Sequence, residues 1–387
     1  MLGRRTFWLS LLAIACGPVP VASTAAPLDA PPPTCRASDG VDAPATLPVS
    51  LYSVPVDRFA ALAEAGVTTV GPYYGTPPDR ALLDAALEVG LGVLYPIGFE
   101  QSTLDGRGRD ALRAQVRAVA EHPAIAGWYV LPEETRPWVD ADVAYLAEVR
   151  TLVHEADPRQ RPLLSYQPNH RRRDELARAS ASFDVVTRGL YANFVGLQTQ
   201  RVWVREGART IAAAADPTQQ PWAVLEMFAE PDDARPGTIE AWVRHDVYAS
   251  LLGGARGLLV FSGWPRGGFP SYATYLAAYL DVVSELNGSK ALATPVLRGT
   301  ASGHAPLHLV DGPASVALGS RRVAAVQSRR FVLGGTVWTY VVNSAERAVT
   351  VELESRCAAT VVSGPSLQGS MLRLPPLGVA VLRAPTL

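Results

Sequence analysis

Two stretches decide how this chain is interpreted: GWYVLPEE at residues 127–134 and PWAVLEMF at residues 221–228. Each is an apolar run, rich in aromatic and branched side chains, with the length of a buried β-strand. The first run ends at Glu133 and Glu134, and the second contains Glu226. An unpaired carboxylate is costly to bury, so an acid in such a strand calls for a functional reason.

Both stretches belong to a regular series of short apolar runs, each followed by an amphipathic stretch of helical period. Strict alternation of strands and helices implies parallel strands, and eight units over about 240 residues match a closed (β/α)₈ TIM barrel. A doubly wound sheet is the alternative, but the turn Tyr52-Ser53-Val54-Pro55 after the first run is not rich in glycine. We expect strands at residues 49–54, 68–73, 92–97, 125–131, 162–166, 183–190, 222–228 and 257–264.

The pattern changes after about residue 292, where short alternating runs are separated by turn signals such as Gly334-Gly335. We therefore predict a catalytic barrel over residues 47–291 and a small antiparallel β-sandwich over residues 292–387. Trp338 and Tyr340 lie on one face of a predicted strand, which favours burial against the barrel over an exposed glycan-binding surface. The predicted strands are residues 330–333, 336–343, 348–354, 358–362 and 379–382.

The N-terminus has the pattern of an export signal, with Arg4 and Arg5 before an apolar stretch. We expect a signal peptide over residues 1–25, or a lipoprotein signal that ends before Cys16, followed by a Pro/Ala-rich lead-in over residues 26–46. Both predict an exported protein, periplasmic or secreted. In the lipoprotein case, a lipid anchor at Cys16 would be its only contact with the membrane.

Composition argues against several functions. The formal net charge is -1, so no broad basic field predicts nucleic-acid binding. The chain has no CxxC motif and no Cys/His cluster, and none of its six histidines ends the first strand, so we predict no metal and no cofactor. A Gly-x-Ser-x-Gly motif is also absent. The oligomeric state is left open.

The spacing of the acids points to one reaction. Glu133 and Glu226 are 226 − 133 = 93 residues apart, which is three strand-helix units, so their strands face each other across the barrel mouth. Two facing carboxylates are what cleavage of a glycosidic bond requires. Side chains alternate along a strand, so Glu134 is the alternative acid if Glu133 faces away.

Three segments resemble the superfamily of retaining (β/α)₈ glycoside hydrolases: HPAIAGWYVLPEE at residues 122–134, WAVLEMF at residues 222–228 and FSGW at residues 261–264. The resemblance covers residues 47–288 and implies that Glu133 is the acid/base and Glu226 the nucleophile. Many members have Asn before the acid/base, and this chain has Pro132. The alternative is a barrel of the cell envelope that binds glycan without cleaving it.

Polar and aromatic residues near the strand ends are candidates for binding a carbohydrate substrate. Aromatic faces stack on sugars, although aromatic residues also fill cores. In the superfamily a tyrosine after strand six can hydrogen-bond the nucleophile, which is the role implied for Tyr191. The predicted substrate-binding residues are Tyr73, Tyr74, Gln167, Asn169, Tyr191 and Trp264.

Export would leave Cys35 and Cys357 in an oxidising compartment. We therefore predict a disulfide between them, which would tie the lead-in to the C-terminal domain. On the chain-entropy model, closing so long a loop contributes about 4–5 kcal/mol. Two free thiols are the alternative.

Overall fold

The computed structural model describes residues 43–386 except for 75–76, 99–105, 132–134, 233–236 and 355–356. The predicted signal segment, Cys16 and Cys35 lie outside the described residues, as do Glu133 and Glu134. Among the helices that are described, none is both long and apolar enough to cross a membrane.

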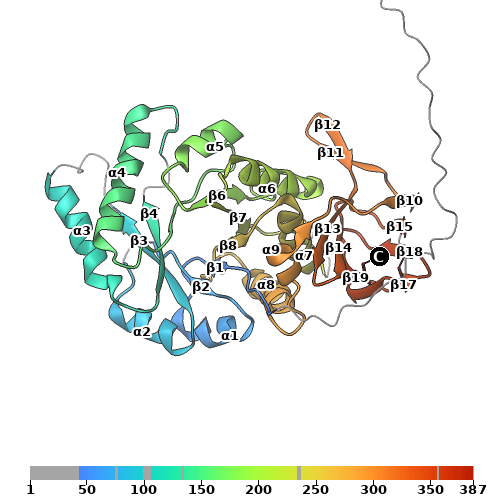
Figure 1. Ribbon diagram of the computed structural model, residues 1–387, viewed down its shortest axis with the longest axis horizontal. Coiled ribbons are helices and arrows are strands. Elements are labelled where there is room, and N and C mark those ends of the chain that lie inside the picture. Colours follow the sequence, from blue (N-terminus) through green and yellow to red (C-terminus); the bar gives the residue numbers. More distant parts are fainter. Residues whose placement is uncertain are drawn as a thin grey trace, which may run out of the picture. The chain divides into compact units, whose positions relative to one another are not determined.

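Eight parallel strands form the barrel, as the alternating pattern predicts (Figure 1). Their order is β5-β4-β3-β2-β1-β8-β7-β6, and the ring closes because Asp184 N donates to Leu163 O and Gly189 N to Gln167 O, both at 2.9 Å. The (β/α)₈ prediction is therefore confirmed. The strands are β1 Val49–Leu51, β2 Thr69–Val70, β3 Gly92–Gly98, β4 Ile125–Leu131, β5 Leu163–Leu164, β6 Val185–Leu190, β7 Gln220–Glu226 and β8 Gly257–Phe261.

Helices connect successive strands, and local side chains and glycines define several of their ends. Asp79 caps α2 by accepting a 2.9 Å hydrogen bond from Leu82 N, and Gly254 ends α7 with a φ of 110° that favours glycine. The helices are η1 Val56–Arg58, α1 Phe59–Glu64, α2 Arg80–Glu88, α3 Gly106–Ala120, α4 Asp140–Ala156, α5 Arg173–Ala179, η3 Gln198–Gln200, α6 Val202–Ala214, α7 Thr238–Gly253, α8 Tyr272–Asn287 and α9 Thr294–Arg298.

Strand boundaries differ from the prediction mainly at their C-terminal ends. The fourth strand has the predicted bounds, but the fifth is two residues long because side chains replace the backbone ladder after Leu164. Ser165 Oγ donates to Val130 O at 2.8 Å, and Tyr166 N donates to the Tyr129 hydroxyl at 3.1 Å. The chain thus leaves the sheet earlier than its apolar pattern suggests.

Alternation on β7 separates two cores. Trp222 and Val224 belong to the cluster inside the barrel, whereas Ala223 and Leu225 belong to the larger cluster beneath the helices. The next residue on the interior-facing side is Glu226, the last residue of β7.

The C-terminal region is an antiparallel sandwich, as predicted. A five-stranded sheet of order β16-β19-β14-β13-β9 faces a four-stranded sheet of order β10-β15-β18-β17, and β11 pairs with β12. The strands are β9 Thr300–Ala301, β10 Leu307–Asp311, β11 Ser315–Leu318, β12 Arg321–Ala324, β13 Val326–Leu333, β14 Thr336–Asn343, β15 Val349–Leu353, β16 Thr360–Ser363, β17 Leu367–Gln368, β18 Met371–Leu374 and β19 Val379–Pro385.

One face of the five-stranded sheet shares its core with the barrel helices. Tyr340 is fully buried, donates a 2.6 Å hydrogen bond to Leu292 O, and lies near Tyr248 of α7. Trp338, on the same face, is partly buried against the same core. The start of the described chain is also held here, because Ala45 N donates to Thr294 Oγ1 at 2.9 Å.

Candidate active site

Glu226 lies at the C-terminal end of β7, where barrel enzymes place their catalytic groups. The residue is only 4% exposed. Its carboxylate accepts hydrogen bonds from two consecutive backbone amides of the loop after β6: Asn193 N at 2.9 Å and Phe194 N at 3.1 Å. In the part of the chain that the structure describes, no cation lies within ion-pair distance of this carboxylate.

Burial raises the pKa of Glu226 from its usual 4.5 to about 7. The amides of Asn193 and Phe194 and the charge of Arg201 oppose the shift, while the charge of Asp246 adds to it. Glu226 therefore exchanges a proton near neutral pH, as groups that take part in acid-base or nucleophilic chemistry often do.

A chain of buried polar groups leads from the Glu226 loop into the C-terminal domain. Arg201 Nη1 donates to Asn193 Oδ1 at 2.8 Å, and the same guanidinium forms two hydrogen bonds with the Asp246 carboxylate. His245 Nδ1 lies 2.8 Å from Asp246 Oδ1, and its Nε2 lies 2.8 Å from Ser344 Oγ. Every member is at most 8% exposed, so the loop that holds Glu226 is itself fixed by buried contacts.

Two tyrosines of α8 complete the surroundings of Glu226. Tyr275 OH lies 3.2 Å from Asn193 Nδ2, and Tyr279 OH donates to the backbone oxygen of Glu226 at 2.9 Å. Both side chains are buried, and burial raises the pKa of each hydroxyl. They therefore stay neutral and act as hydrogen-bonding groups.

Aromatic side chains gather at the same end of the barrel. Tyr191 packs edge-on against Phe228 with ring centroids 5.1 Å apart, and Phe261 contacts Trp264 at 5.5 Å. Tyr74 lies 6.5 Å from Trp264 and is 41% exposed. These rings offer the apolar surface on which sugar rings stack.

The loop after β8 places Trp264. Gly263 N donates to Tyr52 O at 2.7 Å, and a Cβ on Gly263 would lie 2.3 Å from Val54, so only glycine fits. The next residue, Trp264, is covered by Arg266, whose Cζ lies 4.3 Å from the ring centroid. A cation therefore stands beside the aromatic group at the mouth.

The other predicted site residues have different surroundings. Tyr73 donates to Val54 O at 2.9 Å and packs against the outer core, so it is part of the framework. Gln167 is fully buried, and neither polar atom of its amide has a partner among the described residues. Asn169 is half-buried, and its backbone oxygen accepts a 2.9 Å hydrogen bond from Arg188 Nε. Tyr191 stacks on Tyr166 at 5.9 Å.

Sequence reasoning missed Asn193, which binds the Glu226 carboxylate, and Arg201 and Asp246, which fix Asn193 in place. One signal was present, because α7 carries the adjacent polar residues His245 and Asp246 inside a helix whose second half is otherwise buried and mostly apolar. The partner of that pair could not be foreseen, since Arg201 is 45 positions away.

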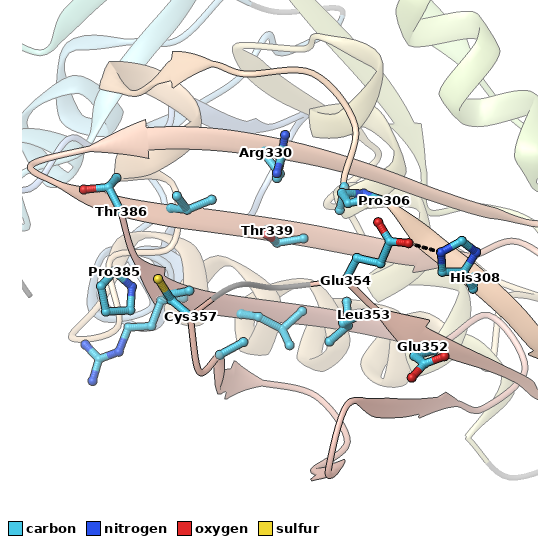
Figure 2. A pocket seen from close by; sticks show the side chains of 16 residues that line it. Pro306, His308, Arg330, Thr339, Glu352, Leu353, Glu354, Cys357, Pro385 and Thr386 are labelled. Atoms are coloured by element: carbon cyan, nitrogen blue, oxygen red, sulfur yellow. Dashed lines mark hydrogen bonds and ion pairs between the residues drawn. The ribbon is translucent and has the colours of Figure 1, made fainter. Parts of the chain in front are cut away.

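The C-terminal domain has a separate cavity of about 890 Å³ (Figure 2). Figure 2 shows Glu354 directed toward His308 at its rim and Cys357 at another side. Its lining combines aliphatic residues such as Leu353 and Leu382 with charged ones, and no Phe, Tyr or Trp is among the described residues that line it. It thus lacks the ring surface that sugar-binding sites commonly use.

The described residues contain no group of three or more His, Cys, Asp or Glu side chains placed to hold a metal ion.

Together, the fold and this site define a (β/α)₈ barrel with an appended antiparallel domain. No family model matches the sequence, and neither does any curated protein. Solved structures do match the fold. An α-amylase from Geobacillus thermoleovorans, in complex with acarbose, has a TM-score of 0.59 at 8% identity, covering 87% of this chain and 98% of the amylase.

A β-galactosidase from Rahnella sp. R3 has a TM-score of 0.57 at 10% identity, covering 90% of this chain and 99% of that one. For Amy13B from Eubacterium rectale the TM-score is 0.54 at 10% identity, over 88% of this chain and 95% of that one. At these identities the similarity establishes the fold, barrel and C-terminal domain included.

Proposed function

We propose that this protein is a glycoside hydrolase acting on an oligosaccharide or polysaccharide. One observation supports this above all: Glu226 is buried, has no cation within ion-pair distance among the described residues, and lies at the catalytic end of the barrel beside a group of aromatic rings. The barrel and its C-terminal domain are also shared with α-amylases and a β-galactosidase. A shared fold does not determine activity, which depends on the residues of the site.

In the proposed mechanism Glu226 is the nucleophile and Glu133 the acid/base. The ionised Glu226 carboxylate attacks the anomeric carbon while Glu133 gives its proton to the leaving glycosidic oxygen. Water then attacks the glycosyl-enzyme, Glu133 takes a proton from it, and Glu226 is released. Retention requires carboxyl groups about 5–5.5 Å apart, which is the separation we expect for Glu133 and Glu226.

The surroundings of Glu226 suit this role. The amides of Asn193 and Phe194 fix the carboxylate and favour its charged form, while burial keeps it from being fully stabilised by water. Tyr74 and Trp264 supply stacking faces for the sugar. A hydroxyl of the substrate or a water molecule would satisfy the buried Gln167 amide, whose unpaired state otherwise costs about 1–3 kcal/mol.

The test is activity of the purified protein on a panel of plant and bacterial polysaccharides, with sizing of the products. Release of shorter products by the wild type, and none by Glu226→Gln, would support the proposal. The anomeric form of the first product, followed by NMR, reports retention or inversion. Glycan binding without any cleavage across the panel would instead support the non-catalytic alternative.

We also propose that the protein is exported and that Cys35 pairs with Cys357. Cys357 is 6% exposed and lies beside the cavity of the C-terminal domain. Thiol titration of the unfolded, unreduced mature protein should find no free sulfhydryl from this pair, and two would refute the pairing. Cell fractionation with detection of bound lipid separates a soluble exported form from an anchor at Cys16.

A further inference from the structure

A second cleft, of about 940 Å³, lies between α6 and the strands β9 to β13. It is distinct from the barrel mouth, because none of the residues around Glu226 lines it. Arginine dominates its walls: six of the described lining residues are arginines, and one is an acid, Glu206. The arginines are Arg173, Arg188, Arg205, Arg209, Arg321 and Arg329.

The single acid cannot neutralise this charge. Glu206 is shared by three of the guanidiniums, with distances of 2.7 Å to Arg205 and 3.3 Å to both Arg209 and Arg321. Among the described residues, no carboxylate lies within ion-pair distance of the other three arginines. Six cations against one anion leave a local charge of 6 − 1 = +5, in a chain whose formal net charge is -1.

Several of these cations are also poorly hydrated. Arg188 is 8% exposed, and among the described residues its one hydrogen-bond acceptor is the backbone oxygen of Asn169. The buried Nε of Arg205 has no partner in the same part of the chain. Desolvation lowers the pKa of Arg188, Arg205 and Arg329. Removing a cation from water without an anion is costly, so the cleft is arranged to gain from a bound anion.

The size of the cleft and the positions of its arginines indicate which kind of anion it would bind. They come from α5, β6 and α6 on one side and from β12 and β13 on the other. A cleft of this volume takes a ligand much larger than one inorganic ion. An extended molecule with several acidic groups could engage both walls, and Trp203 adds an aromatic side chain to the lining.

We propose that this cleft binds an anionic saccharide, such as a chain of uronic acid units. Its carboxylates would pair with Arg173 and Arg329, which have no carboxylate partner among the described residues, and with Arg209 and Arg321, which share Glu206. The choice of a saccharide to carry the charge rests on the proposed function. The cleft would then hold an acidic glycan on the outside of the barrel, away from Glu226.

The experiment is isothermal titration calorimetry on the full chain carrying Glu226→Gln, so that no probe is consumed. The probes are an oligogalacturonate, a neutral malto-oligosaccharide of equal length, inorganic phosphate and a single-stranded oligonucleotide. We expect binding of the oligogalacturonate alone, weakening as salt rises. The double variant Arg209→Ala/Arg321→Ala should weaken it at least about tenfold. Both side chains are about 60% exposed, so the fold should tolerate the change.

Arg80→Ala is the matched control, because Arg80 is an 85% exposed arginine on α2, outside the cleft. It should leave the affinity unchanged. Equal loss in the control, no binding of oligogalacturonate, or equally tight binding of phosphate or the oligonucleotide would overturn the proposal. If the wild type cleaves no glycan but still binds oligogalacturonate in the cleft, the proposed function fails and the binding site stands.

Discussion

Two glutamates of the barrel, both with little-exposed side chains, have opposite surroundings. Glu226 ends β7, is 4% exposed and is bound by two backbone amides. The Glu285 side chain, on α8, is 8% exposed but contacts Arg244, Lys290, the Tyr248 hydroxyl and Ser363. Both side chains are largely removed from water, and they differ most in their partners.

The partners set the ionisation of each group. Burial raises the pKa of both carboxyls, but for Glu285 the hydrogen bonds and charge of Arg244 outweigh burial and hold the pKa below its usual value. For Glu226, the backbone amides and the more distant Arg201 do not outweigh the effect of burial, and its pKa is about 7. A neutralised buried acid serves the structure, whereas one left near its titration point is available for chemistry.

The largest expected effect is on activity. Glu226→Gln keeps the shape of the side chain and removes the nucleophile, so kcat on any substrate found should fall at least about 10³-fold. In Glu226→Ala, added azide should restore part of the rate by attacking in place of the carboxylate. Full activity of Glu226→Gln would contradict the assignment. Glu285→Gln, by contrast, should retain activity in whatever fraction stays folded.

The second prediction concerns pH. The folded-state pKa of Glu226, about 7, exceeds the usual 4.5 by about 7 − 4.5 = 2.5, which corresponds to about 3 kcal/mol. Between these values the folded state binds more protons than the unfolded state, so ionisation of Glu226 should lower the free energy of unfolding as pH rises from 4.5 to 7. Urea titrations should show Glu226→Gln gaining stability relative to wild type over that window.

The pH-rate profile tests the role of the same group. If Glu226 is the nucleophile, kcat/KM should rise with pH through about 7, because only the ionised form attacks. A limb that falls through about 7, and that Glu226→Gln abolishes, would instead identify Glu226 as the general acid.

The third prediction is structural and concerns Glu285. Glu285→Gln leaves Arg244 partly buried without its anion, and breaking a buried ion pair is strongly destabilising. Because the Arg244 side chain is 28% exposed and water screens it in part, we expect a loss of about 2–3 kcal/mol in the free energy of unfolding. An unchanged denaturation midpoint would show that this pair adds nothing to stability.

Glu226 and its surroundings show how much of the site could be predicted from the sequence. Glu226 was predictable because an acid in an apolar strand is a local anomaly, and the barrel followed from the alternation of strand and helix patterns. Arg201 and Asp246 were not predictable as a pair, because their contact depends on how α6 packs against α7. The short fifth strand was missed for a similar reason: the Tyr129 hydroxyl, from another strand, takes the place of a backbone partner.

The smallest expected effect is a difference between substitutions of two serines of the C-terminal domain, Ser344 and Ser363. Ser363 touches Glu285 directly. Among the described residues, Ser344 connects to Glu226 through His245, Asp246, Arg201 and Asn193. Replacing either by Ala removes one buried hydrogen-bonding hydroxyl, so each should cost about 1 kcal/mol of stability. Only Ser344→Ala should also change the pH-rate profile, since loosening Asp246 alters the charges that act on Glu226.

Ser363→Ala is therefore the matched control, because it has a comparable cost and, through the residues that the structure describes, no hydrogen-bonded route to Glu226. The profile should be measured for both variants with the same substrate, and the difference lies in the midpoint of the limb near pH 7. If both midpoints equal that of the wild type, the buried polar groups from Asn193 to Ser344 hold the domains together without affecting the pKa of Glu226. If Ser363→Ala moves the midpoint as much as Ser344→Ala, the shift reflects general loosening rather than transmission through His245.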